Sequence, residues 1–598
     1  MVASSPERIV LGIEQSLTGR RWIDGAGDAR TGLALAQAHG LPEIVGRLLA
    51  ARGLGLDDVG GYLEPRLAAL LPDPSHLLDM DRAVTALVAA IEGKQRIAVF
   101  GDYDVDGATS SALLDRFFRA IGVQLRVYIP DRMKEGYGPN SAAFAKLKDE
   151  GCKVVITVDC GITAYEPLKF ARANGLDVIV VDHHVAEAGL PEAVAVVNPN
   201  RIDETSPHRQ LAAVGVAFLV IVALNRALRT AGYYKRMGRA EPNLLNWLDL
   251  VALGTVADVV PLTGVNRALV TQGIKVLAKR ENAGLRALAD VAKIDEAPEA
   301  YHLGFIMGPR VNAGGRVGEA ELGARLLATD DDAEAHEIAQ RLDAYNRDRQ
   351  KIEEGILNDA MARAEAEAMA GGGSLAFVAG EGWHQGVIGI VASRLKDRFN
   401  RVACVAAVNK GIATGSGRSM PGFDLGAAVI AARHAGILLT GGGHAMAAGF
   451  SCAADKLNEF RAFLDERVSR HVAAAGGLRP TLHIDGMLEA SGATLDLVHE
   501  IDRLGPFGSG NSEPRFVLSG VRVVKADPVG TNHVRCVLTG AMGGRLNGIA
   551  FRCLDTALGH ALMDRAGTPL HIAGRLNENT WQGRSSVQLM IDDAAPAH

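Results

Sequence analysis

Three aspartates alternate with other residues directly after a short apolar run, at Asp102, Asp104 and Asp106. Carboxylates packed this closely repel one another, and a bound cation relieves that repulsion. The same spacing opens an EF-hand calcium loop, which is the first alternative. However, an EF-hand needs a preceding helix and a Glu at the twelfth position, whereas Ile97–Phe100 is strand-like and Leu113 holds that position. We therefore predict carboxylates at the end of a strand in an α/β active site.

Three further apolar segments end in residues that could bind a metal ion. The first ends in Asp159, the second in Asp182, His183 and His184, and the third in Asp258. A single aspartate after a strand is usually a cap or a turn residue, but four such strand ends together are not explained in this way. Aspartates with a neutral imidazole suit a pair of divalent ions such as Mn²⁺ or Mg²⁺, and no cluster of cysteines competes for the metal. The sequence thus predicts a two-metal centre.

Parallel strands are the elements that must bring these side chains together. The alternation of strand and helix patterns predicts a parallel sheet, at whose carboxyl edge the ligands would meet. We interpret the segment 250–257 before Asp258 as one of the four strand-like segments that end in a possible ligand. A helical pattern also runs through 243–257, so the same residues fit a helix. The predicted strands are 97–100, 124–129, 153–158 and 177–181, and the predicted helices are 108–121, 141–150, 163–174, 210–230 and 266–290.

Composition divides the chain into further regions. The catalytic domain is expected to span 96–330. Residues 331–372 are rich in helix formers and end in three glycines, which predicts one long connecting helix. A second α/β domain is expected at 373–470. Short β-rich runs between 475 and 598 predict a small all-β barrel of the OB type, which binds single strands by stacking and backbone contacts. A purely structural barrel is the alternative.

Residues 1–95 have the pattern of a helical preface, which we expect to pack as a lid on the catalytic domain. The chain starts without a basic segment, apolar run and cleavage site, and no uninterrupted apolar span of membrane length is found, so we expect a cytoplasmic protein with no membrane contact. Six cysteines without C-x-x-C spacing indicate reduced, mostly buried thiols. A net charge of −6 argues against nucleic acid, but metal would mask the site carboxylates, and arginines could still line a groove.

Taken together, the motifs resemble the DHH phosphoesterase superfamily. The ordered set is Asp-Tyr-Asp-Val-Asp-Gly at 102–107, Val-Asp-Cys-Gly at 158–161, Asp-His-His at 182–184 and Ala-Asp-Val at 257–259. The segments 382–395, 415–419 and 441–449 are similar to the DHH-associated domain (DHHA1) in the form used by the RecJ-like exonucleases. The resemblance covers most of the chain. It implies a 5′-to-3′ exonuclease on single-stranded DNA that releases 5′-mononucleotides by two-metal hydrolysis.

The resemblance also implies roles for individual residues. Asp159 would bridge the two ions, and His184 would contact the scissile phosphate. Asp102 and Asp182 would not bind the ions directly but would accept hydrogen bonds that hold the loop or orient the imidazole. Arg132 and Tyr137 would belong to the pocket for the 5′ end, and Ser416 and Arg418 are suited to a terminal phosphate. The implied metal ligands are Asp104, Asp106, Asp159, His183 and Asp258, and the implied substrate-binding residues are Arg132, Tyr137, Arg310, Asn312, Arg316, His384, Ser416, Arg418 and His444.

Such an enzyme would act as a monomer in DNA repair and recombination, with a helicase and a single-strand-binding protein as partners. Two alternatives remain open. A DHH phosphodiesterase acting on short oligonucleotides, cyclic dinucleotides or pyrophosphate would share the metal centre but would not need the β module or the long helix. A non-catalytic replication scaffold that binds single strands would be expected to have lost acidic ligands, which this chain retains.

Overall fold

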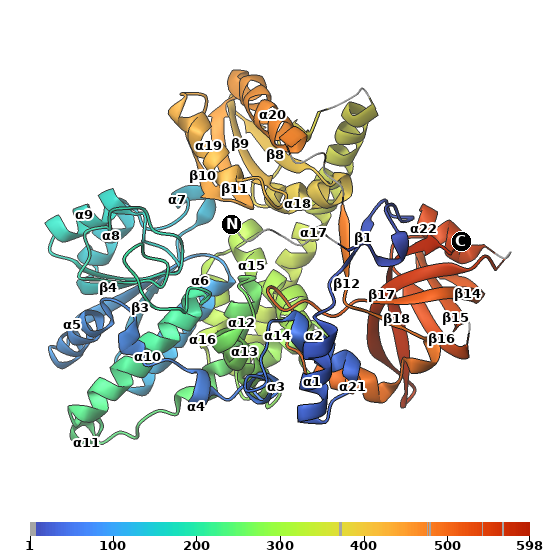
Figure 1. The fold of residues 1–598 in the computed structure, drawn as a ribbon. Coiled ribbons are helices and arrows are strands. Elements are labelled where there is room, and N and C mark those ends of the chain that lie inside the picture. Colours follow the sequence, from blue (N-terminus) through green and yellow to red (C-terminus); the bar gives the residue numbers. More distant parts are fainter. Residues whose placement is uncertain are drawn as a thin grey trace. The chain divides into compact units, whose positions relative to one another are not determined.

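The computed structural model describes residues 8–369, 373–474, 477, 480–540, 542–564 and 567–597 of the 598-residue chain. The chain forms two compact units (Figure 1): Leu71–Leu478 make the larger one, and Met1–Leu70 with Arg479–His598 make the smaller one. The larger unit holds the predicted catalytic region and the second α/β region, and the smaller unit holds the predicted barrel. The N-terminal segment therefore folds with the C-terminal module.

The predicted parallel sheet is present in the larger unit. Its strands are β2 (Arg96–Gly101), β3 (Leu125–Tyr128), β4 (Cys152–Val158), β5 (Asp177–Val181) and β6 (Ala195–Val197), and the helices around it are α5 (Met80–Glu92), α6 (Val105–Ala120), α7 (Arg132–Glu135), α8 (Ser141–Asp149) and α9 (Tyr165–Ala173). The order is β3-β2-β4-β5-β6, and every pair is parallel. β4 and β5 are almost entirely buried, as Val- and Ile-rich strands covered by helices should be. β6 was not predicted.

A group of helices follows the sheet. They are α10 (Ala213–Thr230), α11 (Tyr233–Met237), α12 (Leu248–Ala257), α13 (Gly264–Leu277), α14 (Ala283–Val291), the π-helix η4 (His302–Met307), α15 (Gly308–Val317) and α16 (Glu321–Ala328). The segment before Asp258 is thus a helix, and the prediction of a strand end there is wrong. Residues 248–255 are buried all round, and a short, wholly apolar run has the same pattern in a buried helix and a buried strand.

The single helix predicted at 266–290 is in fact two helices, α13 and α14. Asn282 begins the second, since its side-chain oxygen accepts a hydrogen bond from the Leu285 N–H at 3.1 Å. Among the described residues, α10 alone has the length and hydropathy of a membrane span, and 72% of it is buried inside the fold. It lies against α5 and α6 as a core helix.

One helix of 38 residues, α17 (Asp332–Met369), runs where the connecting helix was predicted. Of the glycines expected to end it, Gly371 and Gly372 lie outside the described residues. The next region contains β7 (Leu375–Glu381), β8 (Val402–Asn409), β9 (Ile412–Arg418), β10 (Thr440–His444), β11 (Ala447–Ala453), α18 (Ile388–Phe399), α19 (Leu425–His434) and α20 (Leu457–Ala474). Its sheet has the order β10-β11-β9-β8-β7, in which only β7 and β8 are parallel.

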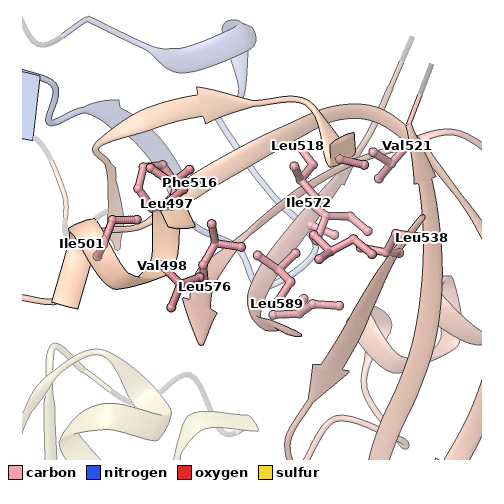
Figure 2. Close-up of a cluster of buried hydrophobic side chains, with 14 of the residues drawn as sticks. Leu497, Val498, Ile501, Phe516, Leu518, Val521, Leu538, Ile572, Leu576 and Leu589 are labelled. Atoms are coloured by element: carbon pink, nitrogen blue, oxygen red, sulfur yellow. The ribbon is translucent and has the colours of Figure 1, made fainter. Parts of the chain in front are cut away.

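The predicted barrel forms in the smaller unit. Its elements are β13 (Gly486–Leu488), β14 (Phe516–Val529), β15 (His533–Gly540), β16 (Gly543–Ala550), β17 (Leu570–Trp581), β18 (Arg584–Pro596), α21 (Leu495–Asp502) and α22 (Ala557–Met563). The order is β13-β14-β15-β16-β18-β17, and a further pairing of β14 with β17 closes it. Figure 2 shows Leu518, Leu538, Ile572 and Leu589 inside, all fully buried. The fold is that of an OB barrel.

The N-terminal segment completes this unit. It contains β1 (Arg21–Asp24), α1 (Ala29–His39), α2 (Glu43–Ala51), α3 (Val59–Leu63) and α4 (Leu67–Leu70), and β1 pairs in parallel with β12 (Thr481–Ile484). The Trp22 Nε1–H donates to Asp593 Oδ2 at 3.0 Å, and Leu48 and Leu49 belong to the same buried cluster as Leu518. Residues 8–70 thus share a core with the barrel, which the sequence did not predict, and the lid on the catalytic domain stays a prediction. An amphipathic pattern predicts that a helix needs a partner but does not identify it.

Candidate metal centre and substrate pocket

The loop between β2 and α6 is shaped by one of its own carboxylates. Asp104 is the N-cap of α6, and its Oδ1 accepts hydrogen bonds from the N–H groups of Asp106 (2.9 Å) and Gly107 (3.1 Å). Position 107 requires glycine, because a Cβ there would lie 2.3 Å from the Asp102 carbonyl oxygen. The chain therefore turns tightly from strand to helix and brings three carboxylates to the edge of the sheet.

Asp106 is held by the start of a second helix. Its Oδ2 accepts from the Ala213 N–H at 2.6 Å and its Oδ1 from the Val214 N–H at 2.8 Å, in the first turn of α10. The positive end of that helix favours a charged carboxylate. Burial and the neighbouring Asp104 nevertheless raise the pKa of Asp106 to about 7. Two elements far apart in the sequence thus fix this side chain.

His183 lies at the centre of the aspartates. Its Nε2 is 3.3 Å from Asp159 Oδ1, 3.4 Å from Asp258 Oδ2 and 3.9 Å from Asp106 Oδ2. Burial lowers the pKa of His183 to about 4, so the imidazole is neutral at neutral pH and can offer a lone pair. Asp159 and Val259, which follows Asp258, both have φ 61°. A positive φ is unfavourable for these residues, and such strain gathers at functional sites.

Four buried acceptor atoms in this cluster have no hydrogen-bond partner. They are Asp102 Oδ1, Asp159 Oδ1, His183 Nε2 and Asp258 Oδ2. Leaving buried polar atoms unpaired is costly, and bound cations would satisfy atoms of this kind. Burial and the surrounding carboxylates raise the pKa of Asp102 and of Asp159 well above the ordinary value, and they raise the pKa of Asp258 to about 9.

The side chains fall into three groups whose possible ligand atoms lie within 4.8 Å of one another. Asp159 and His183 each belong to two groups, so adjacent ions could share them. Carboxylate oxygens and imidazole nitrogens are donors that Mn²⁺ accepts, and Mg²⁺ prefers the oxygens. The groups are Asp106, His183 and Asp258; Asp159, His183 and His184; and Asp102, Asp104 and Asp159.

Asp182 orients the two histidines that follow it. Its Oδ1 accepts from the N–H groups of His183 (2.7 Å) and His184 (3.1 Å) and lies 2.8 Å from His184 Nδ1. Burial opposes its charge, but these interactions outweigh burial and lower the pKa of Asp182 to about 2. Burial also opposes charge on His184, yet the hydrogen bond to Asp182 raises the pKa of His184 to about 9. These interactions favour the protonated form of His184.

Two asparagines that the sequence analysis missed hold the same loop. Asn198 Nδ2 donates to the His184 carbonyl oxygen at 2.9 Å, and Asn200 Nδ2 donates to the His183 carbonyl oxygen at 2.6 Å. Both follow β6, the edge strand that was not predicted. The turn signal Asn-Pro-Asn at 198–200 is the feature that could have identified them.

A row of rings extends from His184. The ring of His444, in β10, stacks on it at 6.1 Å with an interplanar angle of 16°, and Tyr137 meets it edge-on at 6.1 Å. Tyr103 meets Tyr137 edge-on at 6.4 Å, and the Arg132 guanidinium lies 5.0 Å over the Tyr103 ring. The structure thus brings Arg132, Tyr137 and His444 to the metal centre. Tyr103 was missed, although it lies inside the Asp-Tyr-Asp motif.

Ser416 and Arg418 lie together beside the start of α18. Arg418 Nη1 donates to Ser416 Oγ at 3.1 Å and to the Gly417 carbonyl oxygen at 2.9 Å. A Cβ at Gly389, in the first turn of α18, would be 3.1 Å from both Ser416 Oγ and Arg418 Nη2. Within the described ranges, no carboxylate pairs with Arg418. Burial lowers the pKa of Arg418, and the charge of Arg132 adds to this effect, so the two cations lie near each other.

Arg316 and His384 meet at the same place. Arg316 Nη1 donates to the Gly386 carbonyl oxygen at 3.0 Å, and His384 Nδ1 accepts from the Gly386 N–H at 3.1 Å. A Cβ at Gly386 would lie 2.4 Å from the Arg316 carbonyl oxygen, so only glycine allows this approach. Burial lowers the pKa of Arg316 to about 10, and repulsion by Arg132 contributes. Cations from both α/β regions therefore gather next to the metal centre.

Two further predicted substrate residues contact other parts of the protein, and their role in binding substrate stays a prediction. Arg310 Nε lies 3.0 Å from Asp343 Oδ1, and its Nη1 donates to the Ile306 carbonyl oxygen at 2.7 Å. Asn312 Oδ1 accepts from the Val105 N–H at 3.2 Å and so helps to hold the start of α6. Both belong to helix α15, and side chains at different positions of a helix point in different directions. Of its predicted substrate residues, only Arg316 joins the group of cations.

Three regions of the chain match known protein families. Residues 96–255 match the DHH family, N-terminal domain, residues 372–470 match the DHHA1 domain, and residues 484–593 match the RecJ OB domain. The parallel sheet with its acidic cluster, the second α/β region and the barrel coincide with these three matches. Fold and site together define a DHH-family protein that carries a DHHA1 domain and an OB domain.

Similar proteins extend over almost the whole chain. The single-stranded-DNA-specific exonuclease RecJ of Dickeya dadantii is 38% identical, over 93% of this chain and 96% of its own. The crystal structure of RecJ from Thermus thermophilus in complex with Mn²⁺ is 30% identical, covers 95% of this chain and 78% of that one, and has a TM-score of 0.78. The crystal structure of the same Thermus thermophilus protein with Mg²⁺ is 29% identical, covers 96% of this chain and 77% of that one, and has a TM-score of 0.73. The chain belongs to the RecJ family, which confirms the resemblance and the fold class predicted from the sequence.

Proposed function

We propose that this protein is a single-stranded-DNA-specific exonuclease that degrades from the 5′ end and releases 5′-mononucleotides. The observation that carries the proposal is the convergence of unpaired buried acceptor atoms from Asp102, Asp159, His183 and Asp258. Relatives named as exonucleases of this specificity match almost the full length of the chain. This match favours the exonuclease over a phosphodiesterase for short oligonucleotides or cyclic dinucleotides, and over a non-catalytic scaffold.

The cofactors are two divalent ions, Mn²⁺ or Mg²⁺. When bound, the ions supply an activated water and stabilise the attacking and leaving oxygens of the phosphodiester. Asp159 is the proposed bridge, because its Oδ1 is unpaired and it belongs to two of the three ligand groups. Asp104 Oδ1 caps α6, which leaves Oδ2 free to bind an ion. The proposed ligands are Asp104, Asp106, Asp159, His183 and Asp258, with Asp102 supporting the loop.

His184 is the proposed contact to the scissile phosphate. Asp182 holds its Nδ1, so the protonated ring presents Nε2–H to an anion. Tyr137 supports this arrangement: its hydroxyl donates to the Asp159 carbonyl oxygen at 3.2 Å and lies 3.5 Å from His184 Nε2. The ring of His444, from the DHHA1 region, stacks on His184 and so helps to fix it.

The 5′-terminal phosphate is proposed to bind among Arg132, Ser416 and Arg418. Guanidinium groups without carboxylate partners form strong, charge-assisted hydrogen bonds to phosphate oxygens. Holding the terminal phosphate there would register the next phosphodiester at the metal centre, which a two-metal site alone cannot do. Arg316 and His384 line the same space, and Arg310 and Asn312 also support η4 and α6.

The domain limits that we propose are 96–330 for the DHH domain, 331–372 for the connecting helix, 373–470 for the DHHA1 domain and 475–598 for the OB module. A single strand must be exposed before it can be cut from its end. We therefore infer that a helicase and a single-strand-binding protein act with this enzyme in DNA repair and recombination, and that it works as a monomer in the cytoplasm.

Single strands labelled at the 3′ end test this function. Purified protein with Mn²⁺ or Mg²⁺ should release unlabelled mononucleotides and leave a ladder of labelled strands that shorten with time. Chelator and Asp159→Asn should each stop the reaction. Asp177→Asn is the matched control, because Asp177 is an exposed aspartate at the opposite end of a strand in the same sheet. Early release of the labelled nucleotide would contradict the polarity, and turnover in chelator would contradict the metal mechanism.

A further inference from the structure

An exposed pair of aromatic side chains has no role in the proposed function. Tyr301 and Phe305 stack with their ring centroids 5.3 Å apart and an interplanar angle of 25°. They are 59% and 73% exposed. Exposed aromatic rings can stack with the bases of a nucleic acid. The pair lies in the larger unit, on the π-helix η4 and the residue before it.

The helix η4 packs on the end of α12 that carries Asp258. A Cβ at Gly304 would lie 3.3 Å from Val256 Cγ1, and one at Gly308 would lie 3.3 Å from the Ala257 Cβ. These two glycines therefore let η4 and the start of α15 approach the last turn of α12 closely. Because Asp258 is the C-cap of α12, the aromatic pair is carried by an element seated next to the metal centre.

Side chains on both sides hold η4 in place. His302 Nδ1 accepts from the Glu299 N–H at 3.0 Å, and its Nε2 lies 2.9 Å from Glu296 Oε1. Arg310 donates to the Ile306 carbonyl oxygen. Leu303 and Met307 are buried beneath, which leaves the aromatic pair on the outer face. π-Helical segments occur frequently at functional sites, and a fixed backbone lowers the entropy lost on binding.

Cationic side chains lie at the end of η4, where Arg310 donates to the Ile306 carbonyl oxygen. The Asp343 carboxylate pairs with both Arg310 and Arg347, so two guanidinium groups share one negative charge. The Arg347 side chain is 67% exposed. Rings on which bases can stack, together with an exposed excess positive charge, are the features of surfaces that bind single strands.

We propose that Tyr301 and Phe305 form a stacking platform for bases of the single strand on the 3′ side of the scissile phosphodiester. This inference rests on the proposed function. In the proposed function, the cations around Arg418 hold the 5′ end, so the remainder of the strand leaves the metal centre. The helix that carries the aromatic pair packs on the helix that ends at Asp258. Every base has a π face, so stacking serves a nuclease without sequence preference.

Kinetics on two substrate lengths test the platform. The variant Phe305→Ala should raise KM for a 5′-phosphorylated strand of about 20 nucleotides roughly tenfold, with a smaller change in kcat. A dinucleotide does not reach the platform, so its KM should not change. Phe305→Trp should restore the long-strand KM. The control is Met237→Ala, which removes a side chain that is 52% exposed at the end of α11.

Fluorescence reports stacking directly. With 2-aminopurine at successive positions from the 5′ end and chelator present, wild-type protein should quench the fluorescence at particular positions, and Phe305→Ala should abolish that quenching. Equal long-strand KM and equal quenching in the variant would overturn the inference and assign the pair to a protein partner. If wild-type protein does not cleave single strands at all, the proposed function itself fails, so the two failures are distinguishable.

Discussion

Replacing Asp182 by Asn should make the activity fall steeply above neutral pH. Burial opposes a charge on His184, but the hydrogen bond and charge of Asp182, together with the charges of Asp258 and Asp104, raise the pKa of His184 to about 9. An asparagine oxygen can still accept from the backbone N–H groups of His183 and His184, but it carries no charge. The variant therefore keeps part of the loop geometry and loses the largest cause of the raised pKa.

The size of the effect follows from the two pKa values. With a pKa of about 9, His184 is protonated in roughly nine molecules of ten at about pH 8, whereas at its ordinary value of 6.5 it is protonated in roughly 3%. If the cation contacts the scissile phosphate, kcat/KM of Asp182→Asn relative to wild type should fall by roughly thirtyfold at about pH 8 and by progressively less at lower pH.

The assay compares kcat/KM of the two proteins on single-stranded DNA across this pH range at saturating metal. Taking the ratio at each pH cancels the titration of the metal ligands, which both proteins share. In the background His184→Ala, the Asp182→Asn change should give a ratio that is flat with pH. A ratio in the wild-type background that is equally low at every pH would refute the reasoning, because Asp182 would then act only as a scaffold for the loop.

Four further outcomes are expected. In chelated protein, the pKa values of Asp106 (about 7) and Asp258 (about 9) are raised, so these groups contribute stability below the ordinary carboxyl pKa and lose it as the pH rises through the raised values. The rise in Tm on adding Mn²⁺ should therefore grow from about pH 6 to about pH 8. A rise in Tm that is the same at every pH would contradict this. Asp159→Asn should abolish hydrolysis without lowering the Tm of the chelated protein, because it relieves repulsion among buried carboxylates; a large loss of Tm would mean that its charge stabilises the fold. Arg418→Ala should slow cleavage of 5′-phosphorylated strands about tenfold to a hundredfold and reduce the ratio of their cleavage rate to that of 5′-hydroxyl strands. Equal slowing of both substrates would indicate a structural role for Arg418. Removing residues 1–70 together with 475–598 should weaken the binding of long strands more than the cleavage of short ones, and unchanged binding would mean that the barrel is only structural. Removing 475–598 alone should cause aggregation, since it exposes Leu48 and Leu49.

Much of the metal centre could be predicted from local sequence. Asp102, Asp104 and Asp106 alternate directly after a strand, so one turn from strand to helix is enough to bring them together. The Asp182 run likewise follows its own strand, and its hydrogen bonds are made within two residues. Their chemistry depends on neighbours in the chain, and such neighbours are visible as a motif.

Other assignments failed because they depend on distant packing. The apolar run before Asp258 fits a buried strand and a buried helix equally, and only its packing against α6 and α13 makes it a helix. The contact of Arg310 with Asp343, 33 positions away, likewise gives no signal in the sequence, and the role of Arg310 in substrate binding stays a prediction. Aromatic residues at 301 and 305 gave no signal, because exposure cannot be inferred from residue type.

The sequence by itself determined the kinds of ligand, the order of the three folded regions and the parallel sheet, since these depend on residue type and on short-range periodicity. Only the tertiary structure decided that the helix end at Ala213 binds both oxygens of Asp106, and that Arg132 lies close enough to Arg418 to lower the pKa of that guanidinium. It also decided that residues 8–70 complete the C-terminal module. The physical reason is that burial and charge repulsion act between groups that are close in space, whatever their separation along the chain.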